Sequence, residues 1–343
     1  QHSVKELMES GVSPDILVCR TEHHIGEDIK RKLALFCNVD KEAIIESIDA
    51  ETIYDVPNLM MKEGLHTVVM KKLGLKTEEK PILTAWNKFL NNYKNPKETV
   101  EIGLVGKYIE LQDAYKSILE ALEHAGAHNQ LRVNIHPIHS EDLNRKNVDE
   151  KLKGLHGLVV APGFGDRGIE GKIIAVRYVR EKGIPFMGIC LGMQMAVIEY
   201  ARNVLHLENA NSTEMSRGTP HPVIDIMEDQ KMVTEKGGTM RLGAWDCRLE
   251  KGSKAYAIYG QEIISERHRH RYEFNNDYLK MLEDAGLKAT GFNPKTGLVE
   301  IVEIEDHPWF VGVQYHPEYK STVLNPHPLF MAFVKAASLH KKQ

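Results

Sequence analysis

The stretch Pro185-Phe186-Met187-Gly188-Ile189-Cys190-Leu191-Gly192 decides the fold of the larger part of this chain. Its apolar run predicts a buried strand over residues 185–189, and a helix is expected from Gly192 to about Leu205. Gly188 and Gly192 flank Cys190 between these two elements, an arrangement typical of a nucleophile elbow. The glycines permit a tight turn, and the helix N-terminus favours a Cys190 thiolate. The alternative is a buried, unreactive cysteine.

Strands and helices alternate on both sides of this stretch. We expect strands at residues 100–105, 132–138, 157–161, 298–304 and 309–315, and helices at residues 113–126 and 170–182. Such alternation predicts an α/β fold with a mostly parallel sheet flanked by helices. Ligands bind such sheets at the carboxyl ends of the strands.

The first part of the chain is also α/β in character. A strand is expected at residues 15–19 and an amphipathic helix at residues 29–36. Residues 76–98 are charged and rich in turn formers, with one helix expected near residues 82–90. We therefore expect a first unit at residues 1–75, a linker at 76–98 and a second domain at 99–343.

The amino-acid composition excludes several classes of function. The 343 residues hold 44 Lys+Arg against 48 Asp+Glu, a net charge of −4, which argues against nucleic-acid binding by bulk charge. No apolar run approaches the roughly 18 residues of a membrane span, and the N-terminus has no signal-peptide layout. The four cysteines Cys19, Cys37, Cys190 and Cys247 are scattered, without the spacing of a disulfide framework or a zinc site. We expect a cytoplasmic protein with no metal site, nucleic-acid partner or membrane partner.

A thiolate nucleophile needs a base, and Tyr315-His316-Pro317-Glu318 follows the last expected strand. We expect His316 to be the base and Glu318 to orient its imidazole. The loop Ala161-Pro162-Gly163-Phe164-Gly165 follows another strand, so the amides of Gly163 and Leu191 are expected to form an oxyanion hole.

A phosphate-binding loop at residues 165–172 is the competing interpretation of this segment. It fails because five residues separate Gly165 from Gly171 where the Walker motif has four, and Ile173 replaces the required Ser or Thr.

These motifs together resemble the class I (triad) glutamine amidotransferases. Within that class the chain is similar to the CTP synthase family, on the evidence of residues 2–7, 14–17, 34–39, 106–115, 209–214, 238–243 and 266–273. The resemblance implies a class I amidotransferase domain of flavodoxin-like fold, preceded by the C-terminal part of a P-loop-type amidoligase domain.

The same resemblance implies the chemistry. Cys190 would attack the side-chain amide of L-glutamine and release ammonia, with His316 moving protons and Glu318 orienting it. At a second site, ATP with Mg²⁺ would activate UTP, and the ammonia would convert it to CTP. GTP would be an allosteric activator and the enzyme a homotetramer.

The resemblance also implies binding residues. The glutamine pocket would be lined by Gly163, Leu191, Gly192, Met193, Gln194, Glu214 and Arg271. Glu214 suits the substrate's ammonium group and Arg271 its carboxylate. Gln1 and Lys32 would bind the pyrimidine nucleotide, and Arg20 and Ala50 would lie near ATP.

Two of these assignments have a plainer interpretation from the residues alone. Lys32 lies on an amphipathic helix, where a lysine is more typical of a solvated face. Residues 267–271 fit a basic surface patch, or a strand with Arg267, Arg269 and Arg271 on one face and the histidines facing away.

The family's ATP site and Mg²⁺ ligands have no equivalent after Gln1, so we expect this chain to hydrolyse glutamine without making CTP. Two alternatives stay open. One is another triad amidotransferase, serving GMP or carbamoyl phosphate synthesis, and the early segment argues against it. The other is a catalytically silent assembly module, against which the intact Cys190, His316 and Glu318 count.

Overall fold

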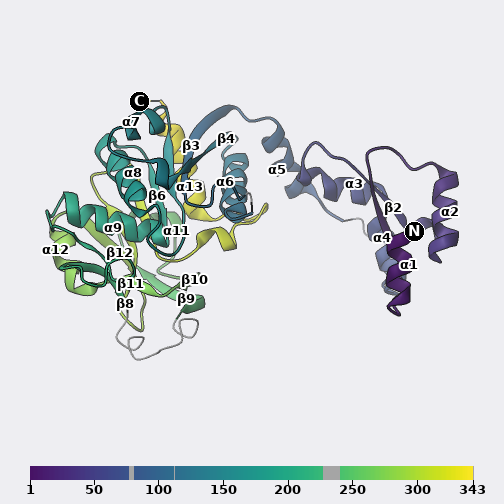
Figure 1. Ribbon diagram of the computed structural model, residues 1–343. Coiled ribbons are helices and arrows are strands. Elements are labelled where there is room, and N and C mark those ends of the chain that lie inside the picture. Colours follow the sequence, from purple (N-terminus) through teal and green to yellow (C-terminus); the bar gives the residue numbers. More distant parts are fainter. Residues whose placement is uncertain (77–80, 112, 227–239, 343) are drawn as a thin grey trace. The chain divides into compact units, whose positions relative to one another are not determined.

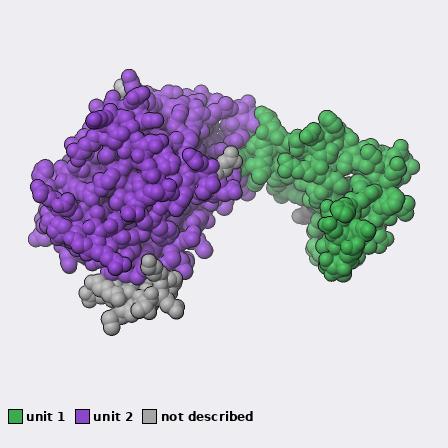
Figure 2. Space-filling view, in the orientation of Figure 1, with its two compact units in different colours: residues 1–90 green, residues 91–343 purple. Residues whose placement is uncertain are grey.

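The computed structural model describes residues 1–76, 81–111, 113–226 and 240–342, which fall into two compact units. Residues 1–90 form the first unit and residues 91–343 the second (Figure 2). No helix of the described residues is long and apolar enough to cross a membrane.

The first unit is built on two parallel strands (Figure 1). Its elements are α1 (His2–Glu9), β1 (Leu17–Thr21), α2 (Glu27–Cys37), η1 (Lys41–Ala43), β2 (Ile44–Ile48), η2 (Ile53–Asp55), α3 (Val56–Lys62), α4 (Leu65–Lys72) and α5 (Thr84–Lys94). The strand and helix expected at residues 15–19 and 29–36 correspond to β1 and α2.

Helix α5 lies within the segment expected as a linker. It packs on the first unit, because Trp86 Nε1 donates to the carbonyl of Tyr54 at 2.8 Å and the rings of Tyr54 and Phe89 meet edge to face at 5.0 Å. The division between the compact units falls after Leu90, inside this helix.

The second unit holds a nine-stranded sheet in the order β10-β9-β12-β13-β14-β6-β5-β3-β4, and a smaller sheet in the order β11-β8-β7. Its strands are β3 (Glu98–Gly106), β4 (Leu131–His139), β5 (Gly157–Val160), β6 (Phe186–Ile189), β7 (Asn211–Ser212), β8 (Pro222–Ile226), β9 (Arg241–Leu249), β10 (Ile263–His270), β11 (Tyr272–Phe274), β12 (Leu287–Phe292), β13 (Val299–Ile304) and β14 (Phe310–Val313).

Helices cover the large sheet on both faces (Figure 1). They are α6 (Lys116–His128), α7 (Val148–Leu152), α8 (Ile169–Lys182), α9 (Leu191–Asn203), α11 (Lys254–Tyr259), α12 (Leu279–Asp284) and α13 (Pro328–His340), with η3 (Ser140–Asp142), η5 (Asn276–Tyr278) and η6 (Pro317–Lys320) between them. One apolar core contains residues of α8, α9 and α12, and the other contains residues of α6, α11 and α13. The predicted α/β fold with a mostly parallel sheet flanked by helices is confirmed.

The parallel strands β14, β6, β5, β3 and β4 continue into the antiparallel strands β13, β12, β9 and β10. Strands β5 and β6 are buried at every position, as expected for parallel strands covered on both faces. Strand β4 ends the sheet, and an edge position tolerates Pro137, which has no N–H for a neighbouring strand.

The β6–α9 junction depends on two glycines. A Cβ on Gly192 would lie 2.2 Å from the carbonyl oxygen of Val160, and one on Gly188 would lie 2.7 Å from the carbonyl carbon of Gly192. Both separations are far below van der Waals contact, so only glycine lets α9 pack this closely on β5 and β6.

The substitution Gly192→Ala is therefore expected to reduce the free energy of unfolding by at least about 3 kcal/mol, because the new methyl group meets backbone and not a movable side chain. Chemical denaturation followed by circular dichroism measures this. Gly218→Ala is the matched control, since its Cβ would meet nothing within 4 Å. Equal stability of the two variants would contradict this account of the junction.

Candidate active site

Three neighbouring parallel strands bring the predicted catalytic groups to one edge of the sheet. Strand β6 pairs with β5 on one side and β14 on the other. Cys190 follows β6, the segment from Ala161 to Gly163 follows β5, and His316 comes shortly after β14. All three segments leave the carboxyl ends of their strands, where α/β proteins bind ligands.

Cys190 has an unusual backbone conformation, with φ 52° and ψ −103°. Few non-glycine residues adopt positive φ, and such strain gathers at functional sites. The surroundings hold it in place, because its N–H donates to the carbonyl of Val313 at 2.7 Å. The residue is buried and lies at the N-cap of α9, whose positive end favours a thiolate.

His316 and Glu318 form a buried pair. Nδ1 of His316 lies 2.7 Å from Oε1 of Glu318, and Pro317 stands between them at the start of η6. Burial opposes protonation of His316, but its interactions with Cys190 and Glu318 raise the pKa of the imidazole to about 11. The ring of Tyr319 stacks on that of His316, with centroids 5.0 Å apart and planes 11° apart. This environment favours an imidazolium opposite the Cys190 sulfur.

Gln314 is a functional candidate that the sequence did not reveal. It is fully buried directly after β14, and its Nε2 donates to Sγ of Cys190 at 3.6 Å. Its Oε1 accepts a hydrogen bond from Nε2 of Gln194 at 3.1 Å, and Gln194 also donates to the carbonyl of Tyr272 at 3.0 Å. A chain of amides thus links the nucleophile to the segment that carries Arg271.

The two amides expected at the oxyanion hole belong to neighbouring residues. A Cβ on Gly163 would lie 3.5 Å from Cδ2 of Leu191, so the β5 loop faces the first residue of α9. The same loop is tied down further along, because the carbonyl of Phe164 accepts a hydrogen bond from Nζ of Lys107. The amide of Gly165 donates to Oε1 of Glu214 at 2.9 Å.

Glu214 and Arg271 are connected to the elbow through different residues. Glu214 contacts the β5 loop itself, two residues after β7. Arg271 lies between β10 and β11, beside the Tyr272 carbonyl that Gln194 contacts. Nε of Arg271 is buried and has no hydrogen-bond partner among the described residues, so the guanidinium keeps a free donor.

The backbone of Gly192 and the side chain of Met193 pack against the sheet. Gly192 packs on the backbone of Val160, and the side chain of Met193 contacts Gly312 of β14. Both residues are buried in the first turn of α9, where they contribute to packing.

In the basic strand the histidines face the interior and the arginines face solvent, which is the reverse of the expected orientation. Along β10 the buried positions alternate with exposed ones, so that His268 and His270 face inward and Arg267 and Arg269 face outward. Nδ1 of His268 lies 2.7 Å from Nε2 of His270. The strand ends at His270, which removes Arg271 from the exposed face.

The inward histidines belong to a buried charged cluster, which we define as Arg241, His268, His270, Glu273 and Glu300. Arg241 lies 3.5 Å from Glu273, and Glu300 lies 3.6 Å from His268. Arg241 also contacts Glu300 at 2.5 Å. Burial raises the pKa of Glu273 to about 8 and that of Glu300 to about 7, although Arg241 opposes both shifts. Burial, together with nearby positive charge, lowers the pKa of both histidines far below their usual range.

The four predicted nucleotide residues lie in the first unit. Gln1 caps α1, Lys32 is exposed on α2, and Arg20 is exposed on β1 with its Nε 3.6 Å from Asp49. Ala50 follows that aspartate after β2. From the CTP synthase-like stretches, Gln112, Gly238 and Thr239 lie outside the described residues.

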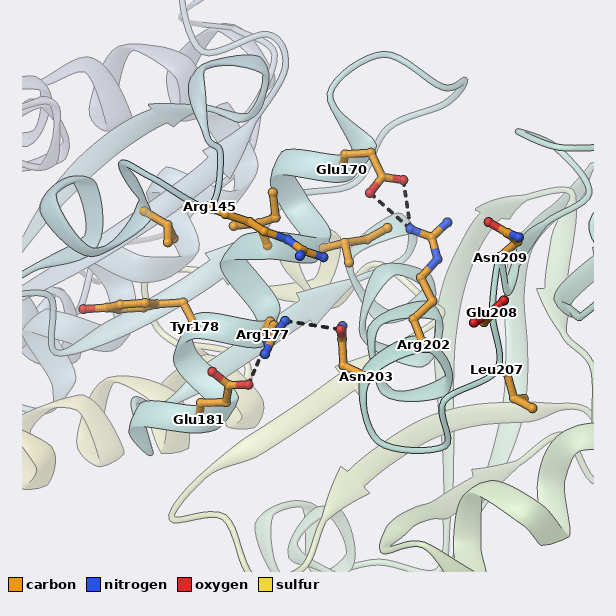
Figure 3. A pocket seen from close by; sticks show the side chains of 13 residues that line it. Arg145, Glu170, Arg177, Tyr178, Glu181, Arg202, Asn203, Leu207, Glu208 and Asn209 are labelled. Carbon is orange, nitrogen blue, oxygen red and sulfur yellow. Dashed lines mark hydrogen bonds and ion pairs between the residues drawn. The ribbon is translucent and has the colours of Figure 1, made fainter.

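A separate pocket of about 780 Å³ lies along α8 and the end of α9 (Figure 3). Its two central arginines are paired: Arg202 with Glu170 at 2.9 Å, and Arg177 with Glu181 at 2.8 Å. None of its lining residues is a predicted site residue.

The described residues also contain no group of three or more His, Cys, Asp or Glu side chains that could hold a metal ion.

The raised pKa of Glu273 predicts how the stability of the protein depends on pH. Its carboxyl group keeps its proton in the folded protein up to about pH 8 and loses it near the ordinary pKa of 4.5 when unfolded. The folded state therefore binds more protons across that interval, so stability should fall as the pH rises through it. In Glu273→Gln this fall should be shallower, measured as thermal midpoints at pH 5, 6.5 and 8, because the amide does not titrate. The exposed Glu262→Gln is the control, and an unchanged slope in the Glu273 variant would refute the assignment.

The comparisons with known proteins agree with this geometry. Residues 110–336 match the family model of class-I glutamine amidotransferases, and residues 1–75 match the model described as the CTP synthase N-terminus. CTP synthase of Flavobacterium psychrophilum is 66% identical over 343 residues, which are 100% of this chain and 64% of that protein. CTP synthase of Bacteroides fragilis is 58% identical over 337 residues, which are 98% of this chain and 63% of that protein.

A solved structure is also similar. The glutaminase domain of CTPS from Trypanosoma brucei, with bound acivicin, has a TM-score of 0.66 and 40% identity, and the match covers 70% of this chain and 94% of that domain. This chain spans just under two thirds of the length of the curated relatives named above. It belongs to the class-I glutamine amidotransferase family, and it is similar to CTP synthases along its whole length.

Proposed function

We propose that this chain hydrolyses L-glutamine to glutamate and ammonia, with Cys190 as the nucleophile. The observation that carries the proposal is the buried arrangement of Cys190 beside the His316–Glu318 pair, at the ends of adjacent strands, with the imidazole pKa raised to about 11. An imidazolium beside Cys190 favours the thiolate form, which is the reactive form of a cysteine nucleophile.

The reaction follows from these groups. The Cys190 thiolate attacks the side-chain amide carbon of glutamine, and the negative charge on oxygen is stabilised by the amides of Gly163 and Leu191. His316 gives its proton to the amide nitrogen, the carbon–nitrogen bond breaks, and ammonia leaves a γ-glutamyl thioester. A water molecule then loses a proton to His316 and attacks the thioester, which releases glutamate and restores the thiolate–imidazolium pair.

Charge complementarity supports L-glutamine as the substrate. Glutamine has an ammonium and a carboxylate, and Glu214 and Arg271 supply the opposite charges beside the elbow. The free Nε donor of Arg271 suits a carboxylate. Gly163, Leu191, Gly192, Met193 and Gln194 would form the wall of the pocket between these two charges, partly through backbone and packing.

The ammonia would serve CTP synthesis. The match of residues 1–75 to the CTP synthase N-terminus supports assigning them to the end of an amidoligase domain, followed by a linker at 76–98 and the glutaminase domain at 99–343. In the longer protein, ATP with Mg²⁺ would activate UTP, and Gln1, Lys32, Arg20 and Ala50 would contribute to nucleotide binding. A cytoplasmic homotetramer activated by GTP fits this role.

The glutaminase is tested by ammonia release from L-glutamine. Cys190→Ala should lower kcat at least about 10³-fold because it removes the nucleophile, and Glu318→Gln should lower it about 10²-fold because the imidazole loses its charged partner. Cys19→Ala, in the first unit, is the cysteine control and should keep full activity. Undiminished release by Cys190→Ala would exclude the mechanism.

CTP formation tests the larger assignment. Joined to the N-terminal part that its relatives carry, the protein should convert UTP to CTP with ATP, Mg²⁺, GTP and glutamine. In that protein, Cys190→Ala should still make CTP from added ammonia but not from glutamine, because only the ammonia source is lost. Glutamine hydrolysis without CTP formation from either source would point to a different triad amidotransferase.

A further inference from the structure

Lys172 is completely buried behind the β5 loop, and the steps of glutamine hydrolysis leave it without a role. It lies in the first turn of α8, and its Nζ donates to the carbonyl of Ala161 at 2.7 Å. The same nitrogen lies 3.8 Å from the position of a Cβ on Gly163. Burying an ammonium group is costly unless negative charge or several acceptors compensate, so its surroundings must explain why a lysine occupies this position.

The surroundings of Lys172 are mostly unfavourable to a cation. Burial, and after it the positive charge of Lys107 directly after β3, lower the pKa of the Lys172 ammonium group to about 7. The N-terminus of α8 carries partial positive charge as well. Two neighbours favour the charged form: the carbonyl of Ala161, which accepts its hydrogen bond, and Cys190, whose negative charge would attract it.

We propose that Lys172 is a positioning residue of the glutaminase site: its ammonium holds the Ala161–Gly163 segment and stabilises the negative charge on Cys190. The inference rests on the proposed role of Cys190 as nucleophile. Interaction free energies are reciprocal, so a thiolate that favours the ammonium is itself favoured by it. A cation next to the oxyanion loop also strengthens the field that the reacting oxygen meets, since Lys172 and Cys190 are both buried.

A purely structural role makes a different prediction. If Lys172 only donates a hydrogen bond to Ala161, a neutral donor can replace it, and the reactivity of Cys190 will not depend on the charge. Lys172→Gln keeps an N–H donor without charge, and Lys172→Met removes both. Lys182→Met, at the exposed end of the same helix, removes a lysine without touching the site.

The primary measurement is the rate of Cys190 alkylation by iodoacetamide from pH 5 to 9, with the site of labelling identified by peptide mass spectrometry. Both Lys172 variants should be labelled about tenfold more slowly at pH 6, because the positive charge that favours the thiolate is gone, whereas Lys182→Met should match the parent protein. In the glutaminase assay kcat should fall about tenfold with little change in KM. A Lys172→Gln profile identical to that of the parent overturns the charge role.

The unaltered protein supplies a second test that does not depend on variants folding. The pH titration of the Lys172 ¹³Cε signal is followed by NMR before and after iodoacetamide blocks Cys190. Blocking removes the thiolate, so the lysine pKa should fall, and an unchanged titration contradicts the proposal. Failure of the parent's Cys190 to react preferentially would instead count against the proposed nucleophile, which keeps the two failures distinct.

Discussion

The conformation of Cys190 is the constraint on which the site depends. A cysteine with positive φ between β6 and α9 requires glycines at positions 188 and 192, because any larger residue would collide with the elbow or with β5. The hydrogen bond from its N–H to Val313 ties the elbow to β14, the strand that leads to His316. Nucleophile, base and oxyanion loop are thus fixed relative to one another by the pairing of β5, β6 and β14.

Around this elbow the protein buries several titratable side chains, and the protonation of each depends on its neighbours. His316 is held protonated by Cys190 and Glu318 although burial opposes it, and the pKa of Lys172 is lowered to about 7 by burial and Lys107 although Cys190 opposes the shift. The cluster of Arg241, His268, His270, Glu273 and Glu300 lies close enough for His316 to depress both histidine pKa values. The site combines a reactive ion pair with fully buried polar side chains around it. This combination favours a single fixed arrangement of the side chains.

Much of the parallel half of the fold was predictable, because β3, β5 and β6 are apolar runs separated by helical patterns. The triad residues were nominated from local motifs, and the structure brings them together. The sequence analysis does not predict β9 and β12, and it offers β10 only as one of two interpretations of residues 267–271. In β10 the inward positions Glu266, His268 and His270 are polar, so the usual alternation of apolar and polar residues is obscured. Gln314 carries no local motif, and only the folded arrangement shows that it contacts Cys190 and that Lys172 contacts the carbonyl of Ala161.

The central claim is that Cys190 carries the substrate's acyl group, and the most direct measurement is to detect that group. The protein is mixed with L-glutamine, quenched in acid within the first turnovers and digested, and the modified peptide is identified by mass spectrometry. The account predicts a γ-glutamyl group on the peptide containing Cys190, labile to hydroxylamine as a thioester is. Glutamine turnover with Cys190 unmodified and the glutamyl group on another side chain would contradict it.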